Sequence, residues 1–111
     1  MDDEIDDQEM TEEDQEKAQQ EMAKLLTNVK DMAIYNLSMI ASQAWHHLGL
    51  VPVPGTTKAE IDLEQAKMAI DLYEANLNVL GPSLEKEMGK QFRQGLTDLQ
   101  LNFVNKKKSQ E

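Results

Sequence analysis

The side chains best able to do chemistry stand together at Trp45, His46 and His47. Two histidines on a helix can bind one metal ion when they are four residues apart, because that spacing places them on one face. Adjacent residues project about 100° apart, so these two imidazoles do not converge. Serine, glutamine, leucine and valine occupy positions 42, 43, 50 and 51 and add no strong ligand. We therefore expect no metal site within one chain, and expect His46 to cap the helix end or to lie in an interface.

A second group resembles a catalytic motif. Ser83 and Lys86 match the Ser-x-x-Lys pattern of penicillin-binding enzymes. The companion motifs of those enzymes are missing, and 111 residues are too few for their fold. Because Ser83 follows Gly-Pro, we expect it to be the N-cap of a helix instead.

Several carboxylates lie in the middle of the chain, at Asp62, Glu64, Asp71 and Glu74. Catalysis by paired carboxylates needs a cleft and shifted pKa values, and the sequence indicates neither. Asp71 follows Lys67 by four residues, which is the spacing of an ordinary surface ion pair and would also suit contact with a partner. With no convergent set of reactive groups, we expect no catalytic residue, no cofactor and no enzyme activity.

The negative charge is concentrated at one end of the chain. The net charge is −10, and residues 1–21 hold 11 of the 21 acidic residues and one lysine, whereas residues 22–111 are neutral overall. Residues 1–10 have almost no apolar side chains, so we expect a disordered acidic arm. Such a charge distribution argues against binding to nucleic acid, whose phosphates need clustered basic residues. The acidic start and the lack of cysteine favour a cytoplasmic location.

An uncharged stretch of 26 residues runs from Met32 to Thr57. Polar residues interrupt it and prolines follow, so we do not expect it to span a membrane. Apolar residues at steps of three or four predict a helix over about residues 11–48, either continuous or broken near Thr27-Asn28. Gly49 is expected to close this helix in the left-handed conformation, and Pro52 and Pro54 to form a rigid turn.

Two more helices are predicted after this turn. Asp62 and Gln65 form a capping-box pattern at the start of the second helix, which Gly81 is expected to end before the third begins. The second helix is apolar on two sides: one carries Leu63, Ala66, Ile70, Tyr73, Leu77 and Leu80, and the other carries Met68, Leu72, Ala75 and Val79. The third helix has one apolar face, formed by Leu84, Met88, Phe92, Leu96, Leu99 and Phe103, and its Gly89 and Gly95 permit close approach of a neighbour.

The segments SMIASQAWHHLGLVPVP and IDLEQAKMAIDLYEANL resemble a small bacterial family known as domain of unknown function eighteen-forty-four. The resemblance covers about residues 31–104. It rests on Ala44, Leu48-Gly49, Pro52, Asp62-Leu63, Ala66-Lys67 and Ile70-Asp71, with a closing segment that ends near Leu101-Asn102-Phe103-Val104. One departure is the connection at residues 78–84, where the family often carries a Lys-Thr-x-Gly-Asn-Leu-Thr-like sequence. The resemblance implies no activity.

These patterns together predict an all-α fold: a small three-helix domain with an acidic arm, completed by self-association. We expect a disordered arm at residues 1–10, a helical extension at 11–30, the domain at 31–105 and a basic tail at 106–111. The function that we expect is that of a non-enzymatic interaction module, which forms a homodimer or higher homo-oligomer and also suits a larger protein partner. The alternative is a small-ligand or metal-binding domain built from Trp45, His46 and His47 of two chains. The predicted interface residues are Tyr35, Met39, Trp45, His46, Met68, Leu72 and Val79.

Overall fold

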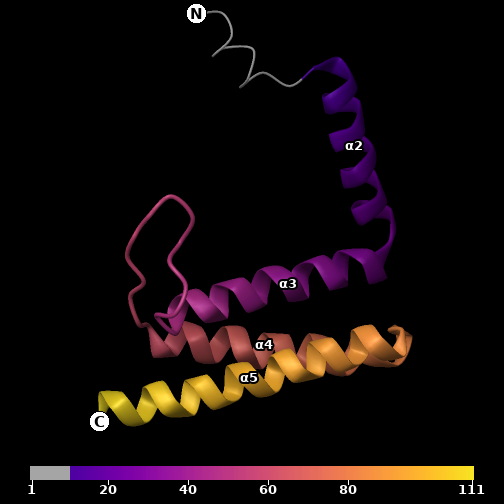
Figure 1. The fold of residues 1–111 in the computed structure, drawn as a ribbon. Coiled ribbons are helices and arrows are strands. Elements are labelled where there is room, and N and C mark those ends of the chain that lie inside the picture. The colour runs from indigo at the N-terminus through magenta and orange to yellow at the C-terminus, as the bar shows by residue number, and fades with distance from the viewer. Residues whose placement is uncertain (1–10) are drawn as a thin grey trace, which may run out of the picture. The chain divides into compact units, whose positions relative to one another are not determined.

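The computed structural model describes residues 11–111, which form four α-helices and one short 3-10 turn (Figure 1). Over this range no strand is formed, although Leu48 and Ile61 make an isolated antiparallel bridge. The predicted all-α fold class is therefore confirmed. The predicted disordered arm, residues 1–10, lies outside the described residues.

The predicted long helix is two helices with a break at Asn28. Helix α2 spans Glu12–Thr27, and the Thr11 hydroxyl caps it by accepting a hydrogen bond from the Asp14 amide. Asn28 is extended, with φ −131° and ψ 106°, and its side chain accepts a hydrogen bond from the Asp31 amide. An asparagine that caps in this way starts a new helix, so α3 spans Val29–His47.

The described residues divide into two compact units, one ending at Met32 and the other comprising residues 33–111, and α3 crosses the boundary. Within the second unit, α3, α4 and α5 run in alternating directions, and α4 is flanked by the other two (Figure 1). This unit contains the core and the candidate site.

The turn after α3 begins as predicted. Gly49 has φ +78°, and a Cβ atom there would lie 2.6 Å from Cγ1 of Ile61. A residue with a side chain would be strained by the backbone conformation and would also collide with Ile61. The Asp62 amide donates a hydrogen bond to the His47 carbonyl oxygen at 2.8 Å, which closes the loop of residues 48–62 at its base.

Helix α4 spans Leu63–Leu80, and the Asp62 side chain caps it by accepting a hydrogen bond from the Gln65 amide at 3.2 Å. Helix α4 supplies six of the ten buried side chains, and five of these lie on its predicted inner side. Leu37, Ala44 and Leu48 from the α3 side and Leu99 from α5 complete the core. The buried side chains are Leu37, Ala44, Leu48, Ala66, Ala69, Ile70, Tyr73, Leu77, Leu80 and Leu99.

The connection from α4 to α5 differs from the prediction in part: Gly81 is the C-cap of α4, as expected, but Ser83 does not start the next helix. Gly81 has helical angles, φ −49° and ψ −47°, and continues into the 3-10 turn η1, Gly81–Ser83. Proline suits the first turn of a helix, so Pro82 prolongs the coil by one tight turn. The prediction that Ser83 is an N-cap is wrong: Leu84 is extended, and Glu85 is the N-cap of α5, Lys86–Gln110. The basic residues 106–108 belong to the last turns of α5.

Candidate functional site

Five of the seven predicted interface residues are well exposed. They are Tyr35 and Met39 on α3 and Met68, Leu72 and Val79 on α4, with exposed fractions between 49% and 82%. Their exposure follows from the two apolar sides of α4 and from a second apolar side of α3. Each helix buries one side in the core of residues 33–111 and presents the other to solvent.

The other two predicted residues, Trp45 and His46, are partly buried. Trp45 follows the buried Ala44 and packs against the core. His46 lies at the end of α3, where its Nδ1 is 3.1 Å from the carbonyl oxygen of Val51. Because a carbonyl oxygen only accepts hydrogen bonds, this contact places the imidazole proton on Nδ1. His46 thereby joins the helix end to the loop.

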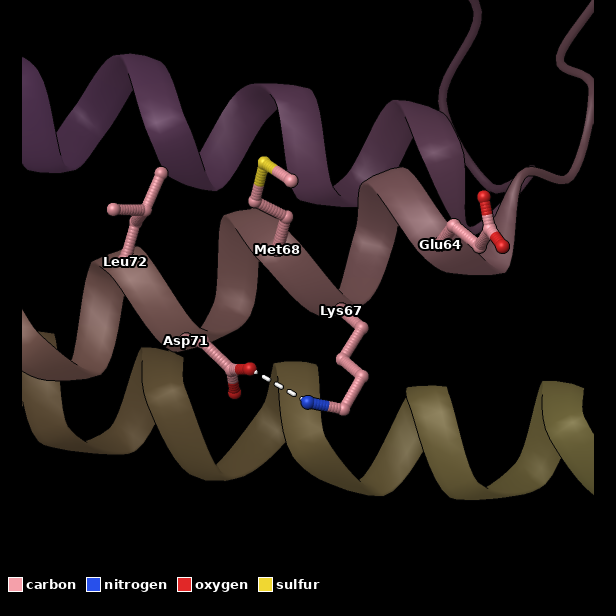
Figure 2. Close-up of a pocket in the computed structure, with 5 residues that line it drawn as sticks. All are labelled: Glu64, Lys67, Met68, Asp71 and Leu72. Atoms are coloured by element: carbon pink, nitrogen blue, oxygen red, sulfur yellow. Dashed lines mark hydrogen bonds and ion pairs between the residues drawn. The ribbon is translucent and has the colours of Figure 1, made fainter.

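Met68 and Leu72 lie together on the side of α4 that points towards α3 (Figure 2). They line two adjoining hollows. One, of about 420 Å³, also contacts Glu64, Lys67 and Asp71. The other, of about 100 Å³, lies between α3 and α4, and is lined by Ile40, Gln43, His47, Gln65, Met68, Ala69 and Leu72.

A third hollow, of about 460 Å³, lies between the end of α3 and the proline loop. Gln43 and His47 line both this hollow and the one between α3 and α4, so the hollows adjoin. The remaining lining residues are Met39, Ser42, His46, Val51, Pro52, Val53 and Pro54. We call the surface formed by these three hollows the α3–α4 face.

Sequence reasoning missed the contribution of the loop to this face. Val51 and Val53 are 48% and 40% exposed and line the third hollow beside Met39. The pattern Leu-Val-Pro-Val carried a signal, because exposed valines that alternate with prolines cannot be explained by a buried strand. The hydrogen bond between His46 and Val51, which holds the loop against α3, cannot be predicted from the sequence.

Two predicted interface residues, Tyr35 and Val79, do not line these hollows. By helical spacing Tyr35 lies on the same side of α3 as Met39, and Val79 on the same side of α4 as Leu72. They extend the apolar sides of the two helices away from the proline loop.

The polar edge of the face is an ion pair. Nζ of Lys67 lies 2.8 Å from a carboxylate oxygen of Asp71, and both side chains point towards α5, whereas Met68 and Leu72 point towards α3 (Figure 2). The hydrogen bond to Asp71 and, secondarily, its charge raise the pKa of Lys67. A lysine acting as a base or nucleophile needs a lowered pKa, so this shift keeps Lys67 a cation.

The rings of His46 and His47 lie close together, with centroids 4.9 Å apart and planes tilted by 56°. Among residues 11–111 no group of three metal-ligating side chains gathers around them or elsewhere. The predicted alternative, a ligand site made by Trp45, His46 and His47 of two chains, stays a prediction. In residues 11–111, no helix combines the length and apolar character needed to cross a membrane.

The family model described as Domain of unknown function (DUF1844) matches residues 34–105, which is more than half of the chain. The resemblance drawn from the sequence is thereby confirmed. Neither a curated protein nor a solved structure matches the chain.

Proposed function

The chain belongs to the family described as Domain of unknown function (DUF1844), and from the surface that its domain exposes we propose a non-enzymatic interaction module that binds a second copy of itself through the α3–α4 face. The observation that supports this proposal is the gathering of large apolar side chains on that face. Met39, Val51, Val53, Met68 and Leu72 are each at least 40% exposed and line adjoining hollows.

Contiguous exposed apolar residues mark interaction surfaces, whereas scattered ones are common on any protein. The mixture of methionine, valine and proline suits such a role. Methionine side chains adapt to irregular surfaces, and the two prolines limit the conformational freedom that binding would otherwise remove. Sites for small substrates are usually enclosed clefts, whereas these hollows are open to solvent. The helical surface of a second copy could cover them.

A second copy is a suitable partner because the rim of the face carries little net charge. Lys67 and Asp71 neutralise one another, leaving Glu64 as the unpaired charge that lines the same hollow. In a two-fold symmetric contact each residue meets its counterpart region, so a strongly charged rim would repel its own copy. Gln43 and His47 lie inside the face and offer hydrogen-bonding groups to the partner.

Sedimentation equilibrium of Leu72→Asp tests the proposal. The wild-type chain should associate reversibly, and an aspartate at position 72 should raise the dissociation constant at least about tenfold, because it buries an unpaired charge in the contact. Asn78→Asp is the matched control: it adds the same charge to the polar side of the same helix and should change the constant less than about twofold. A wild-type chain that is monomeric at every concentration would overturn the proposal, as would equal effects of the two variants.

Native mass spectrometry of the wild-type chain separates this proposal from the ligand-binding alternative. Self-association alone predicts a mass that is a whole multiple of the chain mass. A bound small molecule or metal ion adds mass that should disappear in His46→Ala/His47→Ala, and that result would favour the alternative.

A further inference from the structure

Helix α2 exposes an apolar stripe of its own. Ala18, Met22 and Leu26 recur at steps of four with Leu25 beside them, and none of the 16 residues of the helix is buried. A helix of this length is only marginally stable without packing of its apolar side. Met22 is 53% exposed and Leu26 71% exposed, so the stripe is available to a partner.

The charges of α2 are arranged around this stripe. Taking about 100° per residue, Glu12, Asp14 and Glu21 flank the stripe on its two edges. The opposite side carries charges of both signs: Glu13, Glu16, Lys17 and Lys24. The docking partner of the stripe should therefore be apolar at the centre and basic at the rim.

The C-terminal half of α5 has this chemistry. Leu101 and Val104 are 58% and 47% exposed. Val104 lines a hollow of about 180 Å³ between α4 and α5, whose other lining residues are Lys67, Ile70, Asp71, Gln100 and Phe103. The three consecutive lysines at 106–108 follow directly. Helix α5 carries six basic residues and two acidic ones, which makes it the basic element of the chain.

We propose that α2 of one copy docks antiparallel on the C-terminal half of α5 of a second copy. In this arrangement Ala18 and Met22 meet Val104 and Leu101, and the acidic first turn of α2 meets the lysines at 106–108. The antiparallel direction follows from the order of these groups, because the acids precede the apolar stripe in α2 and the lysines follow Leu101 and Val104 in α5. It also places the positive end of one helix dipole beside the negative end of the other.

A second copy is the occupant to which we commit because of the connection after α2. Because α3, α4 and α5 alternate in direction, α3 begins near the end of α4 and the start of α5. In the proposed register Leu26 lies opposite Thr97, about 16 Å along α5 from its first residue. The single residue that joins α2 to α3, Asn28, cannot span that distance within one copy. Exchange of α2 between two copies avoids that constraint and leaves both docking surfaces filled. This contact includes neither Met68 nor Leu72, although Lys67 and Asp71 line both the hollow beside Val104 and the first hollow of the α3–α4 face.

Charge exchange in the full chain tests the proposal. The first variant carries Glu12→Lys and Asp14→Lys, the second carries Lys107→Glu and Lys108→Glu, and both also carry Leu72→Asp to weaken the α3–α4 contact. Each variant alone should associate about tenfold more weakly than the chain with Leu72→Asp only, because two attractive pairs become repulsive. An equimolar mixture of the two should recover the original affinity, since each α2 then finds an oppositely charged α5.

Two controls complete the experiment, with circular dichroism used to check helix content. Lys17→Glu with Lys24→Glu, on the far side of α2, should leave the dissociation constant within about twofold. Raising the salt from about 0.05 M to about 0.5 M should weaken association of the chain with Leu72→Asp only, because exposed charges are screened. This measurement needs no charge-exchange variant and therefore stands if such a variant does not fold.

The outcomes separate this proposal from the one above. Mixed variants that stay apart, or association that is insensitive to salt, would overturn the α2–α5 contact. If the affinity recovers only when both sets of exchanges are in one chain, the α2–α5 contact lies within a single copy. That result would also overturn the proposed contact between two copies. A chain with Leu72→Asp that is monomeric at every concentration removes this contact and leaves the α3–α4 proposal intact. If Leu72→Asp does not change the dissociation constant but charge exchange does, the α3–α4 proposal fails and the α2–α5 contact stands.

Discussion

The hydroxyl group of Tyr73 on α4 donates a 2.7 Å hydrogen bond to the main-chain carbonyl oxygen of Phe92 on α5. The two rings meet edge to face, with centroids 6.3 Å apart. Gly95, one turn further along α5, leaves room for the hydroxyl, since a Cβ atom there would lie 3.0 Å from it. This contact joins α4, which forms part of the α3–α4 face, to α5, on which α2 of a second copy is proposed to dock.

Tyr73→Phe should lower the free energy of unfolding by about 1 kcal/mol, because it removes the hydrogen bond while keeping the ring. Urea denaturation monitored by circular dichroism measures the change. The Phe92 carbonyl lies within a helix and so keeps a helical hydrogen-bond partner, which limits the cost. A variant as stable as the wild type would show that the bond contributes nothing net to stability.

The same tyrosine should make stability depend on alkaline pH. Burial raises the pKa of Tyr73 to about 12, from 10.0 in an exposed tyrosine. The unfolded chain then loses its proton at lower pH than the folded one, so the stabilisation is complete below pH 10 and is lost as the pH rises towards 12. Thermal unfolding from pH 8 to 12 should show a steeper loss in the wild type than in Tyr73→Phe. Parallel curves would contradict the prediction.

Alanine at Gly95 and at Gly89 should have different effects. Replacing glycine by alanine within a helix gains about 1 kcal/mol of stability where there is space. A Cβ atom at Gly89 makes an ordinary contact with the Arg93 side chain at 3.7 Å, so Gly89→Ala should stabilise. Gly95→Ala should gain nothing or destabilise, because it pushes the hydroxyl of Tyr73 away from Phe92.

Combining Gly95→Ala with Tyr73→Phe tests that explanation. Without the hydroxyl group, alanine at position 95 should recover the gain of about 1 kcal/mol expected of a helical alanine. Strictly additive free energies in this double-mutant cycle would show that the two residues do not interact.

A further comparison concerns the two glycines with positive φ. Gly49 and Gly55 have φ +78° and +86°, and a side chain in this conformation costs about 1–2 kcal/mol. A Cβ atom at Gly55 meets nothing within 4 Å, whereas one at Gly49 collides with Ile61. Gly49→Ala should therefore lower the free energy of unfolding by about 1 kcal/mol more than Gly55→Ala does. Equal losses of unfolding free energy would mean that Ile61 moves aside at no cost.

The local features of the chain were readable from the sequence where one residue type and its spacing determine the outcome. Thr11 and Asp62 cap helices because their oxygen atoms satisfy free amides, and Gly49 ends α3 because it tolerates a positive φ. The inner side of α4 followed from apolar residues at steps of three and four. The end of α4 at Gly81 was predicted correctly, whereas the role of Ser83 was not, because Gly-Pro-Ser also suits one more tight turn.

The sequence by itself determined that the chain is helical, where most helices begin and end, and that α3 and α4 each have more apolar surface than one core can cover. Only the tertiary structure decided which of those surfaces lie together. Helix spacing places Met68 and Leu72 on one side of α4, but it cannot bring Val51 and Val53 beside Met39. That placement depends on two hydrogen bonds, one between His46 and Val51 and one from Asp62 to His47, which fix the loop of residues 48–62 against α3. The path of this loop cannot be predicted from the helical periodicity of the sequence.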